Sequence, residues 1–240
     1  MLELFITEIE PNSDKIYITA GLAATMQGLG YYTTVYKPVQ TGAVENNGYL
    51  QSPDLVFVKL IDTYIQTYFS YLLRSSATPF VAAAEENTLI DKELILKDYE
   101  SIVRSYECVI TDGTSGINTP FAPNFAEKDF IKELSLPVVF VVKPTESAVT
   151  STLMTINHAQ AEGINIRGVI LNDYSENCPP EVKTMPELIN TYTDTQVLGY
   201  FNHIDNIQNA NPNDLISNIL SGIDIEKVFN VKIAKLNPDV

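Results

Sequence analysis

Leu-Pro-Val-Val-Phe-Val-Val, residues 136–142, is the strongest apolar run of the chain. Pro137 lies near its start and Lys143-Pro144 follows its end. The run is too short to span a bilayer. A short continuous apolar run of this kind is typical of a parallel strand that is buried on both faces. It therefore predicts a central strand of a parallel sheet.

Segments on both sides of this run alternate between strand-like and helix-like patterns. Further strands are predicted at residues 2–7, 33–36, 108–111, 166–172 and 197–201. Helices are predicted at residues 15–29, 52–73, 91–106, 124–134, 145–162, 180–192 and 213–220. This alternation predicts an α/β fold, with a doubly wound, mainly parallel sheet and helices on both faces. Residues 1–222 are predicted to form a single domain and residues 223–240 a lightly structured C-terminal tail.

The charge composition argues against some classes of binding partner. The 240 residues carry a net charge of −15, with 30 acidic and 15 basic side chains, which argues against nucleic acid or an anionic membrane as partner. The N-terminus shows no secretory signal pattern. The two cysteines, Cys108 and Cys178, fit no metal spacing. We therefore expect reduced thiols and a cytoplasmic protein.

Residues 35–42, Val-Tyr-Lys-Pro-Val-Gln-Thr-Gly, carry the clearest candidate site. Proline removes a backbone donor, so the strand is predicted to stop at Lys37-Pro38, and residues 42–51 are predicted to form an exposed polar loop. The Lys37 ammonium and the Thr41 hydroxyl, at the carboxyl end of a strand, suit a small anionic or carboxylated ligand. The alternative is a surface turn with a solvated lysine.

This segment and four others, in order, resemble the dethiobiotin synthetase family, ATP-dependent enzymes of biotin synthesis with a P-loop fold. The other segments are residues 78–86, 112–116, 136–142 and 168–173, and the resemblance covers roughly residues 1–201. It implies carboxylation of a diamine, 7,8-diaminopelargonic acid, and ring closure of the carbamate to dethiobiotin. It also implies ATP, Mg²⁺ and a homodimer.

The resemblance assigns roles to individual residues. Lys37 and Thr41 would hold and polarise the carbamate, and Lys15 would balance charge on the transferred phosphate. Asp54 and Asp112 would hold magnesium, although Asp54 reads equally well as a first-turn acid favoured by the helix dipole.

An asparagine and two histidines are the remaining candidates. Asn172 would recognise the adenine edge, although Asn-Asp after a strand is also an ordinary turn. His158 and His203 show no acid partner by spacing and are interpreted as incidental.

The first loop departs from the family pattern. It reads Thr-Glu-Ile-Glu-Pro-Asn-Ser-Asp-Lys-Ile over residues 7–16. A phosphate loop needs glycines, then lysine, then a hydroxyl, whereas Glu8 and Asp14 hold the glycine positions and Ile16 the hydroxyl position. Two like charges ~4 Å apart repel by about 4 kcal/mol at an effective dielectric constant of about 20. The loop is therefore predicted to hold ATP poorly.

The same loop suggests local roles for its side chains. Lys15 is free to pair with Asp14 or Glu10 instead of a phosphate, and Ser13 with Asp14 reads as a helix N-cap pair.

Three hypotheses follow for the whole chain. The first is an active dethiobiotin synthetase-like ligase. The second is a non-catalytic or repurposed homologue that keeps the small-molecule pocket but has lost normal ATP binding. The third, a partitioning-type or amidotransferase-associated P-loop relative, is not favoured by residues 35–42.

Overall fold

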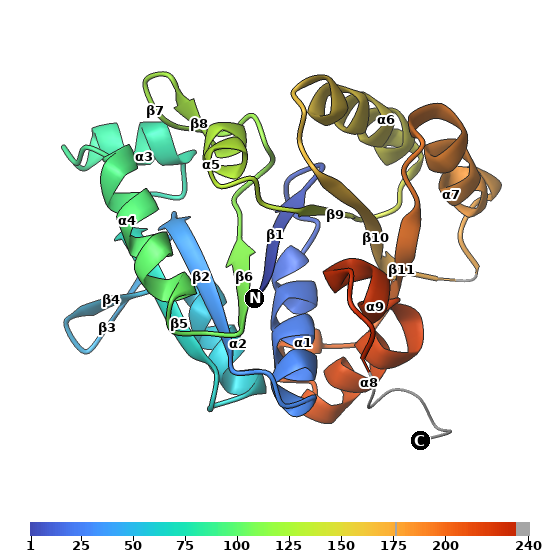
Figure 1. Cartoon of the computed structure of the whole chain (residues 1–240), viewed down its shortest axis with the longest axis horizontal. Helices are drawn as coiled ribbons and strands as arrows, with labels where there is room; N and C mark the ends of the chain where they lie inside the picture. The colour runs from blue at the N-terminus through green and yellow to red at the C-terminus, as the bar shows by residue number, and fades with distance from the viewer. Residues whose placement is uncertain (176, 234–240) are drawn as a thin grey trace.

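The computed structural model describes residues 1–175 and 177–233, and within them a single large sheet forms the centre of the molecule (Figure 1). Its strand order is β11-β10-β9-β1-β6-β2-β5, and every pair of neighbouring strands in it is parallel. The strands are β1 (Leu2–Glu8), β2 (Thr33–Gln40), β5 (Gln66–Leu72), β6 (Cys108–Asp112), β9 (Val138–Val142), β10 (Ile166–Tyr174) and β11 (Val197–Asn202). The predicted mainly parallel sheet is confirmed.

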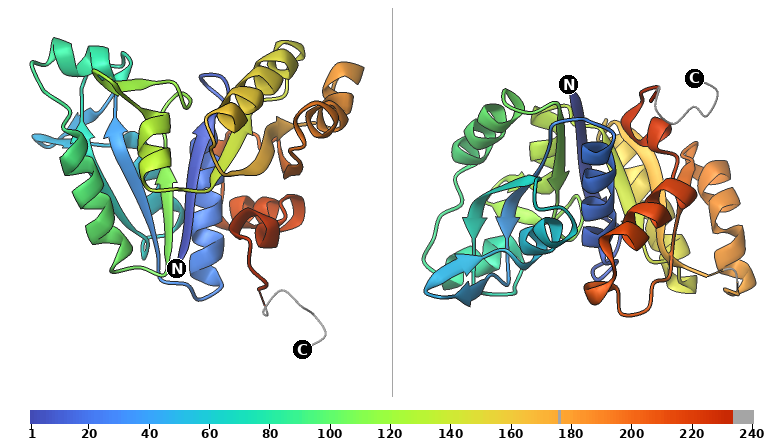
Figure 2. Two further views of the ribbon diagram at one scale, coloured as in Figure 1. Left: turned by 45° about the horizontal axis from the view of Figure 1, so that its top comes forward. Right: turned by 90° about the horizontal axis from the view of Figure 1, so that it is seen from below.

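Helices cover both faces of the sheet (Figure 2). One face packs against α1 (Lys15–Gly28), α2 (Pro53–Ile61), α8 (Pro212–Gly222) and α9 (Ile225–Phe229). The other packs against α3 (Pro79–Glu85), α4 (Lys92–Val103), α5 (Glu127–Glu133), α6 (Glu146–Ala161) and α7 (Pro180–Thr193). Among the described residues, no helix has both the length and the apolar character needed to cross a membrane. The doubly wound architecture is thereby confirmed.

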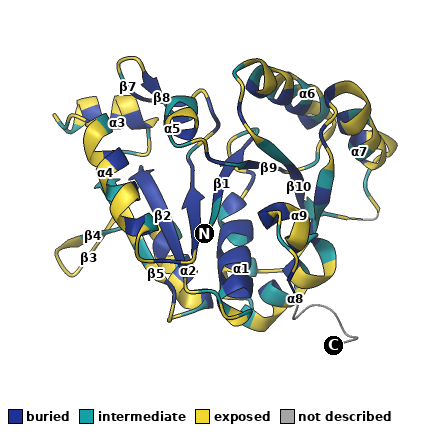
Figure 3. Ribbon diagram, in the orientation of Figure 1, coloured by how far each residue is buried: buried dark blue, intermediate teal, exposed yellow. Residues whose placement is uncertain are grey.

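The apolar run at residues 136–142 contains an interior strand, β9. All of β9 is buried, between β1 and β10 (Figure 3). β1 lies between β9 and β6, so the chain leaves the sheet centre at Glu8 and enters α1 at Lys15. In open parallel sheets, ligands bind beyond the carboxyl ends of the strands, where the strand order reverses. The loop between β1 and α1 occupies that place.

The predicted helix over residues 52–73 is wrong beyond Ile61. α2 begins after the Ser52 N-cap, as expected, but ends at Ile61, and β5 follows as an edge strand beside β2. The sequence of β5, Gln-Thr-Tyr-Phe-Ser-Tyr-Leu, is rich in aromatic residues that favour strands. Because an edge strand keeps one side in solvent, its apolar pattern is weak and resembles the continuation of a helix.

The prediction that β2 stops at Lys37-Pro38 is also wrong. β2 continues to Gln40 and pairs with β5 over this length. Its pairing with β6 ends at Tyr36, so beyond that residue one side of β2 has no neighbouring strand. A proline is tolerated there because no ladder partner needs its missing N–H.

Smaller elements complete the surface. Residues 42–51, predicted as a polar loop, contain an exposed hairpin of β3 (Val44–Asn46) and β4 (Tyr49–Gln51). A second pair, β7 (Pro120–Ala122) and β8 (Phe125–Ala126), precedes α5, and a 3-10 turn, η1 (Ile207–Asn209), precedes α8.

The chain beyond residue 222 does not begin as a lightly structured tail. Ile225, Val228 and Phe229 of α9 are buried against the same face of the sheet as α1 and α8. Residues 223–233 therefore pack with the rest of the fold, because three apolar side chains of one short helix find a place in its core. The remaining residues of the predicted tail, 234–240, lie outside the described residues.

Candidate active site

Asp112 brings together side chains that are far apart in the sequence. It ends β6 and is fully buried. Its Oδ1 accepts hydrogen bonds from Lys15 Nζ at 3.0 Å and Thr19 Oγ1 at 3.1 Å. Its Oδ2 accepts one from Lys37 Nζ at 2.5 Å. Burial by itself raises a carboxyl pKa, but Lys15 and Lys37 hold the pKa of Asp112 below its usual value.

The partner of Lys15 differs from the sequence-based alternatives. Neither Asp14 nor Glu10 pairs with it; the Lys15 ammonium reaches across to Asp112 on a neighbouring strand. From the linear sequence, only the carboxylates of the same loop, Asp14 and Glu10, suggested themselves as partners of Lys15. The contact with Asp112 exists only because β1 and β6 are adjacent in the sheet.

Lys37 is held by two carboxylates at once. Besides Asp112, its Nζ lies 2.8 Å from Asp54 Oδ2 and donates to the Gly113 carbonyl at 3.1 Å. Burial alone lowers a lysine pKa, but Asp112 and Asp54 raise the pKa of Lys37 above its ordinary value. Lys37 is therefore a fixed cation near neutral pH, able to donate hydrogen bonds but not to act as a base.

A small polar cavity opens beside these charges. It has a volume of about 190 Å³ and is lined by Lys15, Lys37, Thr41 and Asp54 among others. Four of the residues predicted from the sequence therefore meet at one place. Thr78 and Thr114 add hydroxyl groups to its wall. The arrangement suits a small ligand that carries both acceptor oxygens and a positive charge.

The loop between β1 and α1 closes on one of its own carboxylates. Glu8 Oε2 accepts hydrogen bonds from the Ser13 backbone N–H at 3.2 Å and from Ser13 Oγ at 2.7 Å. Burial raises the pKa of Glu8, while the nearby Lys15 and the Ser13 hydrogen bonds oppose this shift. Glu8 is 8% exposed, so the contact is an internal part of the site.

The expected N-cap position is found at Asp14, but the expected side-chain cap by Ser13 and Asp14 is not formed. Asp14 is the N-cap residue, but its side chain makes no capping hydrogen bond, and the Ser13 side chain is directed to Glu8. Asp14 has φ 55°, a left-handed conformation that glycine adopts most readily. The glycine-like backbone is thus present at this position although the residue is an aspartate.

Two side chains fix the loop from outside. Ser151 Oγ of α6 donates to Glu10 Oε1 at 2.6 Å. Asn172 Nδ2 of β10 donates to the Ser13 carbonyl at 2.6 Å. Asn172, predicted to read adenine, is therefore buried at the loop and uses its amide N–H to hold it.

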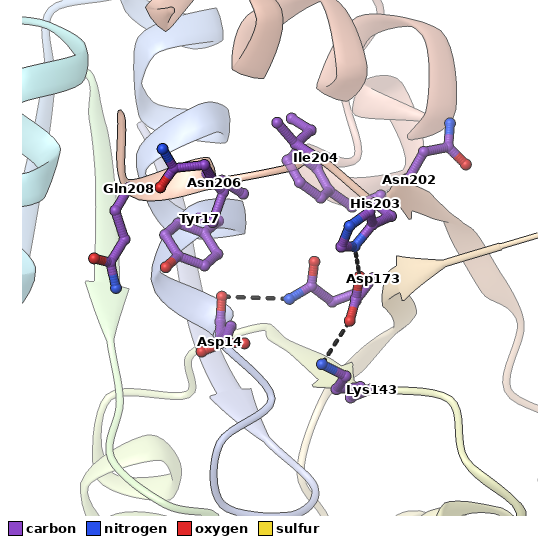
Figure 4. Close-up of a pocket in the computed structure, with 12 residues that line it drawn as sticks. Asp14, Tyr17, Lys143, Asp173, Asn202, His203, Ile204, Asn206 and Gln208 are labelled. Atoms are coloured by element: carbon purple, nitrogen blue, oxygen red, sulfur yellow. Dashed lines mark hydrogen bonds and ion pairs between the residues drawn. The ribbon is translucent and has the colours of Figure 1, made fainter. Parts of the chain in front are cut away.

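A second, larger cavity of about 440 Å³ lies on the other side of the loop (Figure 4). It is bounded by the first turn of α1, with Asp14 and Tyr17, and by the segment that follows β11, with His203 and Gln208. Asn172 also lines it. Asp14 faces this cavity while Glu8 and Lys15 face the smaller one, so the loop separates the two.

His203 has acid partners that the sequence-based interpretation did not find. Its Nδ1 lies 2.5 Å from Asp173 Oδ1 and its Nε2 lies 3.0 Å from Asp205 Oδ1. Lys143 Nζ lies 2.5 Å from Asp173 Oδ2 (Figure 4). Hydrogen bonds to Asp173 and Asp205 raise the pKa of His203. Asp173 is the penultimate residue of β10 and His203 follows β11, so only strand adjacency reveals the pair.

Glu127 was also missed. It is fully buried in α5 and accepts hydrogen bonds from Thr7 Oγ1, and from the backbone N–H and Oγ1 of Thr114, both at 2.5 Å. These bonds fix the end of β1 and the segment after β6 relative to each other. The glutamate at the start of a helix looked like an ordinary first-turn acid.

The predicted magnesium ligands are both engaged with lysine. Asp54 and Asp112 each pair with Lys37, and Asp112 also accepts from Lys15 and Thr19. Within the described part of the chain, no cluster of three or more His, Cys, Asp or Glu side chains has the geometry of a metal site. Their role as magnesium ligands stays a prediction.

Comparison with known families defines the class of protein. A family model described as AAA domain matches residues 3–211, and the chain belongs to this family. Solved structures with the same fold include a chain of the MinC:MinD cell division protein complex of Aquifex aeolicus, with a TM-score of 0.56, 15% identity and coverage of 94% of this chain and 93% of that chain. A ParA family ATPase from Chlorobium tepidum has a TM-score of 0.55 and 14% identity, and covers 97% and 93%. These structures share the α/β fold of this chain.

The relatives of this chain in sequence indicate a narrower class of protein than the shared fold does. An ATP-dependent dethiobiotin synthetase of Bacillus cereus is 28% identical over 199 residues, which is 83% of this chain and 82% of the relative. The enzyme of the same name from Bacillus subtilis is 27% identical over 213 residues, 86% of this chain and 90% of the relative. The predicted resemblance to dethiobiotin synthetases is confirmed.

Proposed function

We propose that this chain is a dethiobiotin synthetase-like enzyme whose 190 Å³ cavity binds a diamine and its carbamate. The observation that carries this proposal is Lys37, a buried cation between Asp54 and Asp112 with Thr41 on the same cavity wall. The relatives named as ATP-dependent dethiobiotin synthetases support the assignment.

The chemistry of the cavity suits carbamate formation. A substrate amine attacks the carbon of carbon dioxide and loses one proton to solvent, giving a carbamate anion. Because the three Lys37 N–H groups are engaged by Asp112, Asp54 and the Gly113 carbonyl, a carbamate oxygen accepts from Lys37 by taking the place of the partly exposed Asp54. The Thr41 hydroxyl donates to the carbamate as well, and both bonds strengthen as negative charge develops. Asp54, 27% exposed in its side chain, is placed to accept a hydrogen bond from the second amine of the substrate.

Ring closure needs a better leaving group on the carbamate carbon, which phosphorylation supplies when ATP is bound. The 440 Å³ cavity, with Asn172 in its wall, has room for a base on one side of the loop. On the phosphate side, Glu8 occupies the Ser13 donors and Lys15 is paired with Asp112. In this arrangement the loop does not fit a triphosphate.

The second candidate is a homologue that binds the small molecule without turning over ATP. The contact between Glu8 and Ser13 favours it, because the loop satisfies its own donors. Both candidate functions use the cavity around Lys37. They differ in whether the protein turns over added ATP. A homodimer, ATP and Mg²⁺ remain expectations from the dethiobiotin synthetase resemblance.

The test is calorimetric titration of the protein with 7,8-diaminopelargonic acid and bicarbonate, with and without ATP and Mg²⁺. Lys37→Ala should abolish ligand binding, a loss of at least about tenfold in affinity or 1.4 kcal/mol. Lys59→Ala, an exposed lysine in the last turn of α2, is the matched control and should bind like the unaltered protein.

Retained affinity in Lys37→Ala would contradict the pocket assignment. Diamine binding with phosphate release supports the enzyme, whereas diamine binding without any phosphate release supports the binding protein. Circular dichroism spectra of both variants establish that the fold is kept.

A further inference from the structure

The loop between β1 and α1 has the parts of an anion site. The first N–H groups of a helix have no partner within the helix, and α1 begins here at Lys15. Ser13 adds a backbone N–H and a hydroxyl, and both are directed to one point. Such convergent donors at the start of a helix are a general means of binding phosphate.

The point at which the Ser13 donors converge is occupied by the protein itself. Glu8 Oε2 accepts from both of them, at 3.2 and 2.7 Å. Burial raises the pKa of Glu8, and the Lys15 charge and the two Ser13 hydrogen bonds oppose that shift. A carboxylate oxygen that accepts a loop N–H and a hydroxyl beside a lysine has the surroundings of a bound phosphate oxygen. Glu8 therefore does more than repel an anion from a distance.

We propose that the Glu8 carboxylate is an intramolecular anion that fills the phosphate position of this loop, so that a phosphate chain binds only when Glu8 is displaced. The proposal deepens the proposed function and rests on it for the nature of the ligand, a nucleotide triphosphate or other polyphosphate. It makes Glu8 a built-in competitor of that ligand.

The surrounding contacts keep this competitor in place. Asn172 holds the Ser13 carbonyl and Ser151 holds Glu10, so the loop around Glu8 is anchored to both β10 and α6. Glu10 is the matched acid: it lies in the same loop, but its carboxylate is bonded to Ser151 and not to the Ser13 donors. Comparing the two acids separates occupation of the anion position from general repulsion.

The experiment measures binding of tripolyphosphate, and separately of ATP, to the full-length chain by calorimetry. Glu8→Ala should bind tripolyphosphate at least about tenfold more tightly than Glu10→Gln. Glu8→Gln, which removes the charge but keeps the shape, should lie between Glu8→Ala and the unaltered protein. Circular dichroism and thermal unfolding verify the fold, and Glu8→Gln gives the result if Glu8→Ala does not fold.

The inference is overturned if Glu8→Ala or Glu8→Gln gains no more affinity than Glu10→Gln. Product formation from the diamine is measured in parallel, so that the two proposals fail separately. Tighter tripolyphosphate binding without any product supports the inference and contradicts the enzyme. Product formed by the unaltered protein, with no gain in affinity from Glu8 variants, supports the enzyme and contradicts the inference.

Discussion

At the scale of single residues, the site is a balance of buried charges. Asp112 pairs with both Lys15 and Lys37, and Asp54 adds a second carboxylate to Lys37, so that two negative charges face two positive ones. Burying an ion without partners costs several kcal/mol, so each of these side chains stabilises its neighbours in the ionised form. The cavity consequently holds fixed charges before any ligand arrives, which is the preorganisation that carbamate binding requires.

His203 provides a pH-dependent test at this scale. Its pKa is raised above the ordinary value of 6.5, mainly by the hydrogen bond to Asp173, so its charged form is favoured in the folded protein. The resulting stabilisation is complete below pH 6.5 and is lost as the pH rises through the folded-state pKa. An NMR titration of the His203 ring should give a midpoint above 6.5.

Variants of the two flanking aspartates serve as controls for this titration. Asp173→Asn should lower the His203 midpoint more than Asp205→Asn, because Asp173 makes the larger contribution. A midpoint at or below 6.5 in the unaltered protein would show that the pair does not form in solution.

The sequence predicted which residues line the site better than it predicted which of them contact one another. Lys15, Lys37, Thr41 and Asp54 were predicted and do line one cavity. The partner of Lys15, and the bond between Glu8 and Ser13, were not predicted. Both depend on which strands are neighbours and on how a loop with left-handed residues folds back, which linear spacing does not reveal.

At the scale of elements, the carboxyl ends of neighbouring strands determine the site. β1, β2 and β6 end at Glu8, Gln40 and Asp112, and these ends meet around the smaller cavity. Interior strands were predictable because burial on both faces gives continuous apolar runs. The edge strand β5 was missed because its outer side faces solvent and its aromatic residues are partly exposed.

The junction of β11 with the segment after α8 offers a test of element packing. Gly199 has φ 152°, and a Cβ there would lie 2.2 Å from the Gly222 carbonyl oxygen. Gly199→Ala should therefore lower the free energy of unfolding by about 1–3 kcal/mol, as overpacking does. Urea unfolding followed by circular dichroism measures the change.

Gly28→Ala is the matched control for Gly199→Ala. A Cβ at Gly28, the last residue of α1, meets nothing within 4 Å. Alanine there should leave stability unchanged or raise it by about 0.4–1 kcal/mol, because the unfolded chain loses freedom. Equal effects of the two substitutions would contradict the close approach at Gly199.

At the scale of the whole molecule, the chain folds around two apolar layers, one on each face of the sheet. The layer beneath α1 extends to α9, where Val228 is fully buried. Val228→Ala should destabilise the whole fold by about 2 kcal/mol, since it removes buried methyl groups and leaves a cavity. The measurement is the urea midpoint of the single unfolding transition.

Leu220→Ala is the surface control for Val228→Ala. Leu220 in α8 is 45% exposed, so its truncation should change stability by less than about 0.5 kcal/mol. If Val228→Ala is equally mild, residues 223–233 do not contribute to the folded domain, and the sequence-based domain boundary at 222 would stand.

The sequence by itself determined the class of fold and most members of the site. Periodicity and apolar runs report burial directly, so they revealed the interior strands and most of the helices. Only the tertiary structure decided which charges meet, because pairing depends on strand order and on side-chain reach across elements. Asp112 at the end of β6 joins Lys15 at the start of α1 to Lys37 of β2, and Glu8 of β1 accepts hydrogen bonds from Ser13. The Ser13 donors of the loop are thus bonded to the loop's own Glu8 carboxylate, with which an anionic ligand would have to compete.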